Sequence, residues 1–348
     1  MVWNEQSTGG LEVWLTTLII AEAGVNHDGK LSQALDLVNV AFESGADIVK
    51  FQTFRATSLA TKEAPSAAYQ RLDTRDSSTQ YQMLEKLQFS EKHHSKIIDF
   101  CNSKNIQFLS TAFDEKSAEM LYKLGQRKFK IPSGEITNYP LLAHIGSYGL
   151  PVFLSTGMSN LDEIEAAIQH LENSGTKRDQ IPVLQCTTAY PAPMHDLNLL
   201  AIQAFANRFG VKVGYSDHSR GIEASIAAVA LGASVIEKHF TLDKNLPGPD
   251  HKASLEPDEL KSLVQAIRNV ELALGDGHKR LMNSEVENIS VARKSIVASK
   301  SIKSGEKFST DNLTTKRPGT GISPMEWQNW IGKTANRDYL PDEFITND

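Results

Sequence analysis

Apolar residues recur in short runs along the first three quarters of the chain, and each run ends in glycine or polar residues. We count eight such runs, whose length and β-branched residues are typical of buried strands. The runs are TLIIAEAG (17–24), DIVKFQTF (47–54), QFLSTAF (107–113), KFKIPSG (128–134), PVFLSTG (151–157), IPVLQCTT (181–188), KVGYSDH (212–218) and SVIEKHFT (234–241).

Longer amphipathic segments separate these runs, and several end in glycine, as helix C-termini often do. Alternation of strands and helices predicts a parallel sheet, and eight units predict an α/β fold closed into a (β/α)8 TIM barrel. An open doubly wound sheet is the alternative. The number of units and the lack of a GxGxxG or GxxxxGK[ST] turn after the first strand argue against it.

Two further segments complete the predicted organisation. Residues 55–90 are too long for an ordinary connection after a barrel strand, so we expect a lid over the carboxyl ends of the strands, with disordered decoration as the alternative. After a long final helix, short strand-like pieces alternate with turn clusters. We therefore predict a barrel over residues 1–280, a linker over 281–290 and a small, mostly β domain over 291–348.

Composition excludes several classes of protein. The 348 residues are 40% hydrophobic and 22% charged, with a net charge of -6, which is typical of a globular protein and gives no basic surface for nucleic acid. The two cysteines, Cys101 and Cys186, lie far apart, so we expect neither a disulfide framework nor a thiolate zinc site, and a reducing cytoplasm fits best. The N-terminal segment has no basic start and no long uncharged apolar run, so we expect neither a signal peptide nor a membrane span.

Polar residues gather where the predicted strands end, which is where barrel enzymes place their active sites. Period-two alternation puts Ser216 with His218 on one face of a strand, and Glu237 with His239 on one face of the next. Charged groups inside a barrel cost free energy unless they are paired or bind a ligand, and a structural ion pair such as Glu22 with Lys50 is the plain alternative. The strand-end residues are Glu22, Lys50, Gln52, Thr111, Phe113, Lys130, Ser133, Glu135, Ser155, Thr187, Thr188, Tyr190, Ser216, His218, Glu237, Lys238 and His239.

Two histidines on neighbouring strands, His218 and His239, are candidate metal ligands. They could hold one cation and leave positions open for water or substrate, as catalytic metals require. A hydrogen-bonded scaffold role is the alternative for each. We expect the histidines in helical or connecting segments at the surface, namely His93, His94, His144, His170, His195 and His278.

Lysines and serines at the same strand ends could form a cradle for a phosphate or carboxylate. Lys50 and Lys130 would supply charge, and Ser133 and Ser155 would supply hydroxyl donors beside the backbone of PSGE and STGM. The alternative is that the small residues only let helices pack close to the strand ends.

Taken in order, these segments resemble the sialic acid synthase family. The matching stretches are IIAEAGVNHDG, KFQTF, STAFD, FKIPSGEITNYPLL, LSTGM, CTTAYPAP, GYSDHSRG, IEKHFTLDKNLPGPDHKASLEP and KRPGTGISP. The resemblance implies a divalent metal on His218 and His239, with Mn²⁺ favoured over Mg²⁺ or Co²⁺. It implies that phosphoenolpyruvate binds at Lys50, Lys130, Ser133, Ser155, Ser216 and Thr188, the last standing where some relatives carry asparagine. It places the sugar at Gln52, Thr111, Phe113, Glu135, Tyr190 and Asp250.

The tail is similar to the antifreeze-like domain that ends these synthases. The resemblance implies a homodimer in which that domain covers the partner's barrel and brings Arg317 to the N-acetyl group of the sugar. A tail that binds ice or carbohydrate without catalysis is the competing hypothesis, although a shared fold does not imply a shared function.

The implied reaction joins phosphoenolpyruvate and water to an N-acetylated hexosamine, N-acetylmannosamine being favoured, and releases phosphate and a nine-carbon 2-keto sugar acid. Either Glu22 or Glu135 would transfer protons. A legionaminic acid precursor is the alternative acceptor. A more distant alternative is a Schiff-base lyase or aldolase that uses Lys50, Lys130 or Lys238.

Overall fold

The computed structural model describes residues 16–64 and 79–347. The chain divides into two compact units, Met1–Gly275 and Asp276–Asp348.

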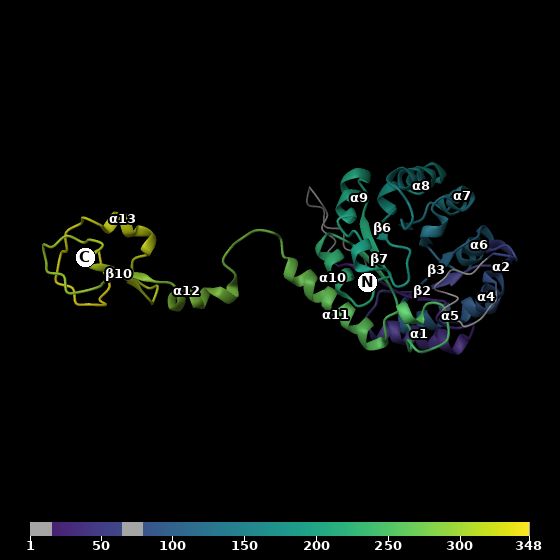
Figure 1. Cartoon of the computed structure of the whole chain (residues 1–348), viewed down its shortest axis with the longest axis horizontal. Helices are drawn as coiled ribbons and strands as arrows, with labels where there is room; N and C mark the ends of the chain where they lie inside the picture. The colour runs from purple at the N-terminus through teal and green to yellow at the C-terminus, as the bar shows by residue number, and fades with distance from the viewer. Residues whose placement is uncertain (1–15, 65–78, 348) are drawn as a thin grey trace. The chain divides into compact units, whose positions relative to one another are not determined.

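The first unit is built from parallel strands surrounded by helices (Figure 1). Each of the eight predicted runs contains one strand. The strands are β1 (Leu18–Gly24), β2 (Ile48–Thr53), β3 (Gln107–Ala112), β4 (Phe129–Ile131), β5 (Val152–Ser155), β6 (Val183–Cys186), β7 (Val213–Asp217) and β8 (Val235–His239). The helices are α1 (Leu31–Glu43), α2 (Ala56–Leu59), α4 (Gln80–Leu87), α5 (Glu91–Lys104), α6 (Glu115–Lys123), α7 (Tyr139–Gly146), α8 (Leu161–Ser174), α9 (Ala201–Phe209), α10 (Glu223–Ala230) and α11 (Pro257–Leu274).

The strands form one sheet in the order β3-β2-β1-β8-β7-β6-β5-β4. The first and last strands of the chain's barrel, β1 and β8, pair in parallel, with Glu22 opposite His239. At the other seam β3 and β4 lie in contact, but no ladder joins them among the described residues, so the barrel is nearly closed. The predicted (β/α)8 barrel is confirmed, and the open sheet is excluded.

Side chains inside the barrel form layers along its axis. The layer toward the amino ends of the strands is apolar and buried, and consists of Ile20, Ile48, Leu109, Phe153, Leu184 and Val235. Two residues further along β1, β2 and β8, the inward positions are Glu22, Lys50 and Glu237. Because side chains alternate along each strand, the interior changes from apolar in one layer to charged in the next.

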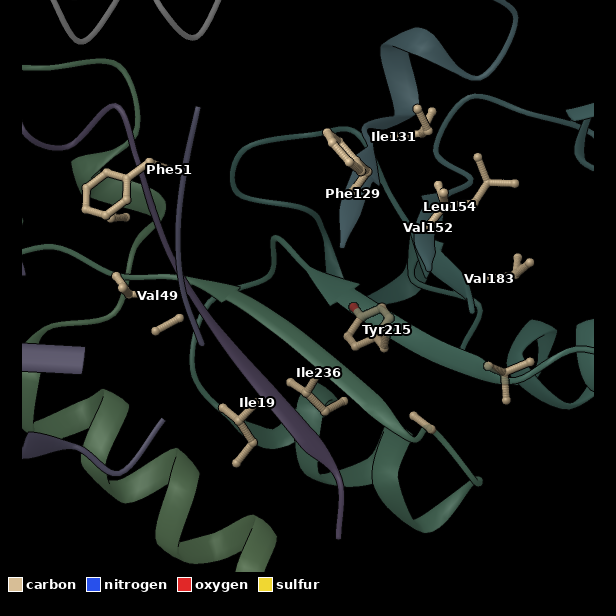
Figure 2. Packing of buried hydrophobic residues seen from close by; sticks show 14 of the residues in the cluster. Ile19, Val49, Phe51, Phe129, Ile131, Val152, Leu154, Val183, Tyr215 and Ile236 are labelled. Carbon is tan, nitrogen blue, oxygen red and sulfur yellow. The ribbon is translucent and has the colours of Figure 1, made fainter. Parts of the chain in front are cut away.

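The outward faces of the strands pack against the helices. Ile19, Val49, Phe129 and Ile236 belong to this larger buried cluster, which Figure 2 shows from close by. Burial of such side chains stabilises the fold by roughly 1.5–3 kcal/mol each. The outer core thus holds the strands in place and leaves their carboxyl ends available for chemistry.

His94 corrects one expectation, because it is fully buried rather than at the surface. It lies on the same buried face of α5 as Ile97 and Cys101, three and seven residues further on. Its Nε2 lies 2.7 Å from the Thr53 hydroxyl, and its Nδ1 lies 2.9 Å from the Ser90 carbonyl oxygen. Both ring nitrogens of His94 therefore have hydrogen-bond partners. Its spacing from Ile97 and Cys101 could already have indicated that it lies on the buried face of the helix.

The predicted lid lies partly in the described residues. Residues 65–78 of it lie outside them, whereas α2 and α4 pack together in a cluster with Val25 and Phe54. Leu59, Met83 and Leu87 of this segment line a cavity that the strand-end residues Lys50, His218 and His239 also line. The described parts of the insertion thus lie at the mouth of the barrel.

The second unit contains an antiparallel pair, β9 (Ser295–Ala298) and β10 (Leu313–Lys316), and isolated bridges such as Ile302 with Tyr339. Two short helices, α12 (Val286–Ala292) and α13 (Trp327–Trp330), accompany the strands. A small core forms around Phe308, Trp330 and Tyr339. The mostly β prediction is confirmed for this unit, whereas α12 was not predicted.

Both cysteines are buried and free. Within the described ranges, no helix combines the length and the hydropathy that crossing a membrane requires.

Candidate active site

A cavity of about 290 Å³ lies at the carboxyl ends of the strands. It is lined by every residue to which the resemblance assigned a catalytic, substrate or metal role in the synthase reaction, except Arg317, whereas the strand-end residues Thr187 and Lys238 lie outside the lining. The lining residues with such a role are Glu22, Lys50, Gln52, Thr111, Phe113, Lys130, Ser133, Glu135, Ser155, Thr188, Tyr190, Ser216, His218, His239 and Asp250. The barrel thus brings together side chains that are dispersed over more than 200 residues of sequence.

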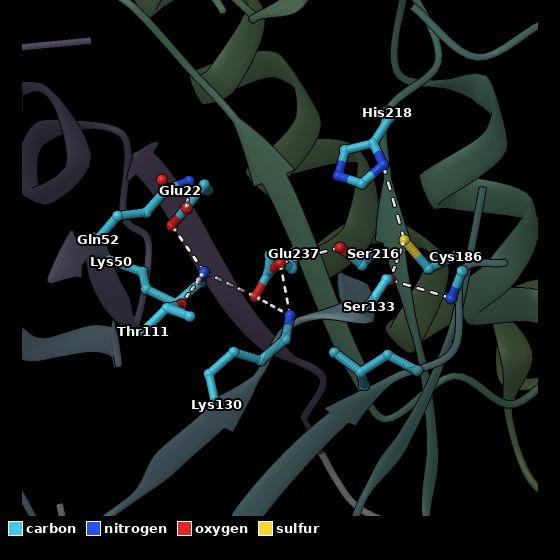
Figure 3. A network of polar contacts seen from close by, with 12 residues as sticks. Glu22, Lys50, Gln52, Thr111, Lys130, Ser133, Cys186, Ser216, His218 and Glu237 are labelled. Carbon is cyan, nitrogen blue, oxygen red and sulfur yellow. Dashed lines mark hydrogen bonds and ion pairs between the residues drawn. The ribbon is translucent and has the colours of Figure 1, made fainter. Parts of the chain in front are cut away.

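Lys50 lies at the centre of a buried ionic network (Figure 3). Its Nζ lies 2.9 Å from a Glu22 carboxylate oxygen and 3.5 Å from a Glu237 carboxylate oxygen. The same ammonium donates to the Thr111 hydroxyl at 2.9 Å. Neighbouring strands supply these groups, since Glu22 and Lys50 are register partners on β1 and β2.

Glu237 connects this network to the far side of the barrel. Lys130 donates to both of its carboxylate oxygens, at 2.7 and 2.8 Å, and Ser216 donates to one at 2.9 Å. Burial would raise the pKa of Glu237, but Lys130 and Lys50 outweigh burial and lower it. Glu237 therefore remains a carboxylate across the physiological range.

At Glu22, in contrast to Glu237, burial outweighs the nearby lysine and the pKa is raised. Burial raises its pKa to about 7, the Glu237 carboxylate acts in the same direction, and Lys50 opposes both. Burial also lowers the pKa of Lys130 below its ordinary value, despite Glu237. Two ammonium groups and two carboxylates thus share one buried layer, in which burial brings the pKa of Glu22 close to neutral pH.

The two candidate metal ligands lie side by side, with ring centroids 5.3 Å apart. His218 Nδ1 lies 2.8 Å from the Thr187 carbonyl oxygen, a contact that places its proton on Nδ1 and leaves the Nε2 lone pair for a ligand. Nδ1 of His239 is buried and has no hydrogen-bond partner among the described residues. The imidazole pair therefore fits a divalent transition metal.

Protonation would compete with a metal at these rings. Burial lowers the pKa of His239 well below its usual value, which favours the neutral, ligating form. Burial acts the same way on His218, but Cys186 and the Thr187 carbonyl outweigh it and raise the pKa. In the part of the chain that the structure describes, no group of three or more His, Cys, Asp or Glu side chains could hold a metal, so other ligands would come from water or substrate.

A turn of small residues borders the lysines. The Gly157 amide donates to the Ser133 hydroxyl at 3.0 Å. A Cβ at Gly157 would lie 2.1 Å from the Thr188 hydroxyl, so only glycine allows this approach. The Ser155 hydroxyl is buried without a partner among the described residues, and it lines the cavity. An unsatisfied donor beside two ammonium groups suits an anion.

Three of the remaining predicted residues lie around the rim. Tyr190 packs on both histidine rings, at centroid distances of 4.1 Å from His218 and 5.8 Å from His239. Glu135 accepts from the Asn138 amide at 2.6 Å, and Gln52 donates to Glu22 at 3.4 Å. Glu135 is half-buried, whereas Glu22 is almost fully enclosed.

Arg317 lies in the second unit, where its side chain is exposed and its Nε donates to the Ala292 carbonyl at 2.9 Å. Its predicted role therefore remains a prediction.

Two residues of the site had no role assigned from the sequence. Glu237 was placed correctly on the face of His239 by the period of two, but its two lysine partners come from other strands. Cys186 lies on β6, where its sulfur is 3.6 Å from His218 Nδ1 and 3.5 Å from the Ser133 hydroxyl. Only its inward position on that strand could have indicated it.

The fold and the polar cavity at the carboxyl ends of its strands define a (β/α)8-barrel enzyme with an appended β domain. The chain belongs to the NeuB family, whose model matches residues 37–279, and residues 293–348 match the SAF domain.

Named relatives support the assignment. The N,N'-diacetyllegionaminic acid synthase of Campylobacter jejuni is 54% identical over 94% of this chain and 98% of that protein. The enzyme of the same name from Legionella pneumophila is 48% identical over 91% of this chain and 90% of that protein. A crystal structure of N-acetylneuraminic acid (sialic acid) synthetase from Leptospira borgpetersenii, in complex with citrate, has a TM-score of 0.70 and 33% identity, and covers 82% of this chain and 95% of that chain.

Proposed function

We propose that this enzyme condenses phosphoenolpyruvate with an acetamido-substituted hexose and water, and releases phosphate and a nine-carbon 2-keto sugar acid. One observation carries the proposal: a buried pair of ammonium groups, Lys50 and Lys130, borders the same cavity as the imidazoles of His218 and His239. Such a cavity can hold a substrate with two anionic groups, a carboxylate and a phosphate, beside the aldehyde that it attacks.

Phosphoenolpyruvate would bind over the lysine layer. Lys50 and Lys130 offset the charge of its carboxylate and phosphate, and the hydroxyls of Ser155 and Ser133 offer further donors. A divalent metal held by His218 and His239, Mn²⁺ being favoured, would supply Lewis acidity toward the aldehyde of the acceptor.

The bonds change in three steps. The π electrons of the C2–C3 double bond of phosphoenolpyruvate form a bond from C3 to C1 of the open-chain acceptor; the C=O π bond of the acceptor breaks, its oxygen takes up a proton to become a hydroxyl, and positive charge develops at C2. Water then adds to C2 and loses a proton. The resulting tetrahedral intermediate breaks its C–O bond to phosphate as its C2 hydroxyl loses a proton, which gives the 2-keto acid. Glu22, with a pKa raised to about 7, suits the proton transfers better than the half-buried Glu135.

The acceptor carries one or two acetamido groups. N-acetylmannosamine is the acceptor that the sequence favoured, but the higher identities, 54% and 48%, are to N,N'-diacetyllegionaminic acid synthases, against 33% to the N-acetylneuraminic acid synthetase. Removing the three carbons of pyruvate from a diacetamido nine-carbon acid leaves a hexose with two acetamido groups. We therefore place this diacetamido hexose first and N-acetylmannosamine second.

One experiment tests the proposal. The enzyme is incubated with Mn²⁺, phosphoenolpyruvate labelled with ¹⁸O at the bridging oxygen, and each acceptor in turn. The masses of the released phosphate and of the sugar acid are then measured by mass spectrometry. We expect ¹⁸O in the phosphate and faster turnover with the diacetamido hexose. Activity with pyruvate in place of phosphoenolpyruvate, together with a pyruvate adduct that borohydride traps on a lysine, would instead indicate the Schiff-base enzyme.

A further inference from the structure

A second buried ion pair lies on the outer side of the barrel, behind the two histidines. Asp217 on β7 and Lys238 on β8 are one residue away from His218 and His239, and alternation points them away from the cavity, which neither lines. Lys238 Nζ lies 2.9 Å from Asp217 Oδ2, and both side chains are at most 1% exposed. The mechanism proposed above gives this pair no role.

The backbone ladder between β7 and β8 ends at this pair. Its last register partners are Asp217 and Lys238, so His218 lies one residue beyond the last pairing. His239 is still held on its other side, because it pairs with Glu22 of β1. No ladder bond therefore sets the distance between the two imidazoles.

Side-chain bonds of Asp217 replace the ladder at that point. Its Oδ1 accepts from the Ser219 amide at 2.8 Å and from the Ser219 hydroxyl at 2.6 Å, and its Oδ2 accepts from the Ser225 hydroxyl at 2.6 Å. The carboxylate thus holds the residue that follows His218. The His218 carbonyl is itself fixed, because it accepts from the Ala192 amide at 2.8 Å.

Lys238 completes the connection. Besides Asp217, its ammonium donates to the Ser219 carbonyl oxygen at 2.6 Å. The residue before His239 is therefore bound to both residues that flank His218. A buried ion pair gives little net stability over an apolar pair of similar volume, so stability alone does not account for it.

We propose that Asp217 and Lys238 are positioning residues that set the separation of His218 and His239 and thereby the affinity of the site for a divalent metal. The inference rests on the proposed metal site. Outer partners that orient metal ligands typically contribute about 10- to 100-fold to affinity.

The test measures Mn²⁺ binding to the full-length protein by the electron paramagnetic resonance signal of free Mn²⁺, without substrates. We expect D217N and K238M each to weaken binding by about 10-fold or more. Because the two residues act together, D217N/K238M should lose no more than the worse single variant. K238R keeps the charge and should retain more affinity than K238M.

Q126L is the matched control. Gln126 is buried and bonds the backbone amide and carbonyl of Ser110, on the outer face of β3, at 2.8 and 3.0 Å. Its loss should lower thermal stability but change Mn²⁺ affinity by less than about 2-fold. If K238M folds poorly, D217N is compared with Q126L at equal loss of thermal stability, and a greater loss of Mn²⁺ affinity in D217N supports the positioning role.

The outcomes separate the two proposals. Wild-type affinity in D217N and K238M, or an equal loss in Q126L, would overturn the positioning role and leave the metal site standing. If the wild type binds no Mn²⁺, Co²⁺ or Zn²⁺, the metal site and the positioning role both fail.

Discussion

Lys130 and Glu237 join opposite sides of the barrel, because the Lys130 ammonium on β4 donates to both carboxylate oxygens of Glu237 on β8. The carboxylate also lies 3.5 Å from Lys50. Glu237 is thus the carboxylate that both ammonium groups share, and Glu22 is a second partner for Lys50 alone. An anionic substrate enters a site whose lysines are already held in position.

Replacing Glu237 by glutamine should make the stability of the protein depend on a bound anion. The substitution leaves two buried ammonium groups without their shared carboxylate, so the free energy of unfolding should fall by roughly 3–5 kcal/mol. Phosphoenolpyruvate should then raise the melting temperature of the variant by more than that of the wild type, because it supplies the missing charge. Thermal scans with and without phosphoenolpyruvate measure both effects.

Glu259→Gln provides the control for that comparison. Glu259 binds Lys244 at the surface, with an N–O distance of 2.6 Å and partly exposed side chains. Its loss should cost less than about 1 kcal/mol and should not change the response to phosphoenolpyruvate. Equal responses in both variants would contradict the balancing role of Glu237.

Glu22 should make stability fall as the pH rises. Its pKa is about 7 in the folded protein, against an ordinary value of 4.5, so between these values the folded state holds a proton that the unfolded state has lost. The stability present below pH 4.5 is therefore lost progressively up to about pH 7. Glu22→Gln mimics the protonated acid, and its free energy of unfolding relative to wild type should increase by up to about 3 kcal/mol from pH 5 to pH 8. Urea unfolding at several pH values measures the difference, and a difference independent of pH would exclude the raised pKa.

Much of the site follows from local sequence patterns. The period of two assigned Lys50, His218 and His239 to the barrel interior, because the alternation of side chains depends only on neighbouring residues in a strand. The same period separates Lys238 from His239 and points it outward, so Lys238 is unsuited to a Schiff base in the cavity. Such patterns carry no information on which strands face each other.

The contacts across the barrel could not be predicted in the same way. The bond between Lys130 and Glu237 joins residues 107 positions apart, and it depends on how far the barrel closes. The raised pKa of Glu22 likewise depends on burial and on Glu237, which the sequence around Glu22 does not contain. The eight-residue helix α7 carries too few turns for a clear amphipathic pattern.

His218→Ala should abolish a metal-dependent reaction without unfolding the protein. Chelator-treated wild type should regain activity with Mn²⁺, whereas the variant should remain at least about 100-fold slower at saturating Mn²⁺. Its circular dichroism spectrum should be unchanged. His195→Ala is the control, because His195 is 83% exposed and lies outside the cavity lining. A fully active His218→Ala variant would contradict the metal assignment.

Arg317 offers a test of the expected sharing of sites between subunits. Arg317→Ala and His218→Ala should each be nearly inactive alone, because one would lack a sugar contact and the other a metal ligand. Suppose that Arg317 acts on the partner's barrel. In a mixed dimer, the barrel of the Arg317→Ala chain keeps both histidines and receives an intact Arg317 from the His218→Ala chain, so one of the two sites is complete. Random exchange of subunits makes half of the dimers mixed, so about a quarter of the wild-type activity should return. Mixing each variant with itself is the control. If Arg317 acts within its own chain, or if the protein is a monomer, mixing restores nothing, and size-exclusion chromatography distinguishes these two cases.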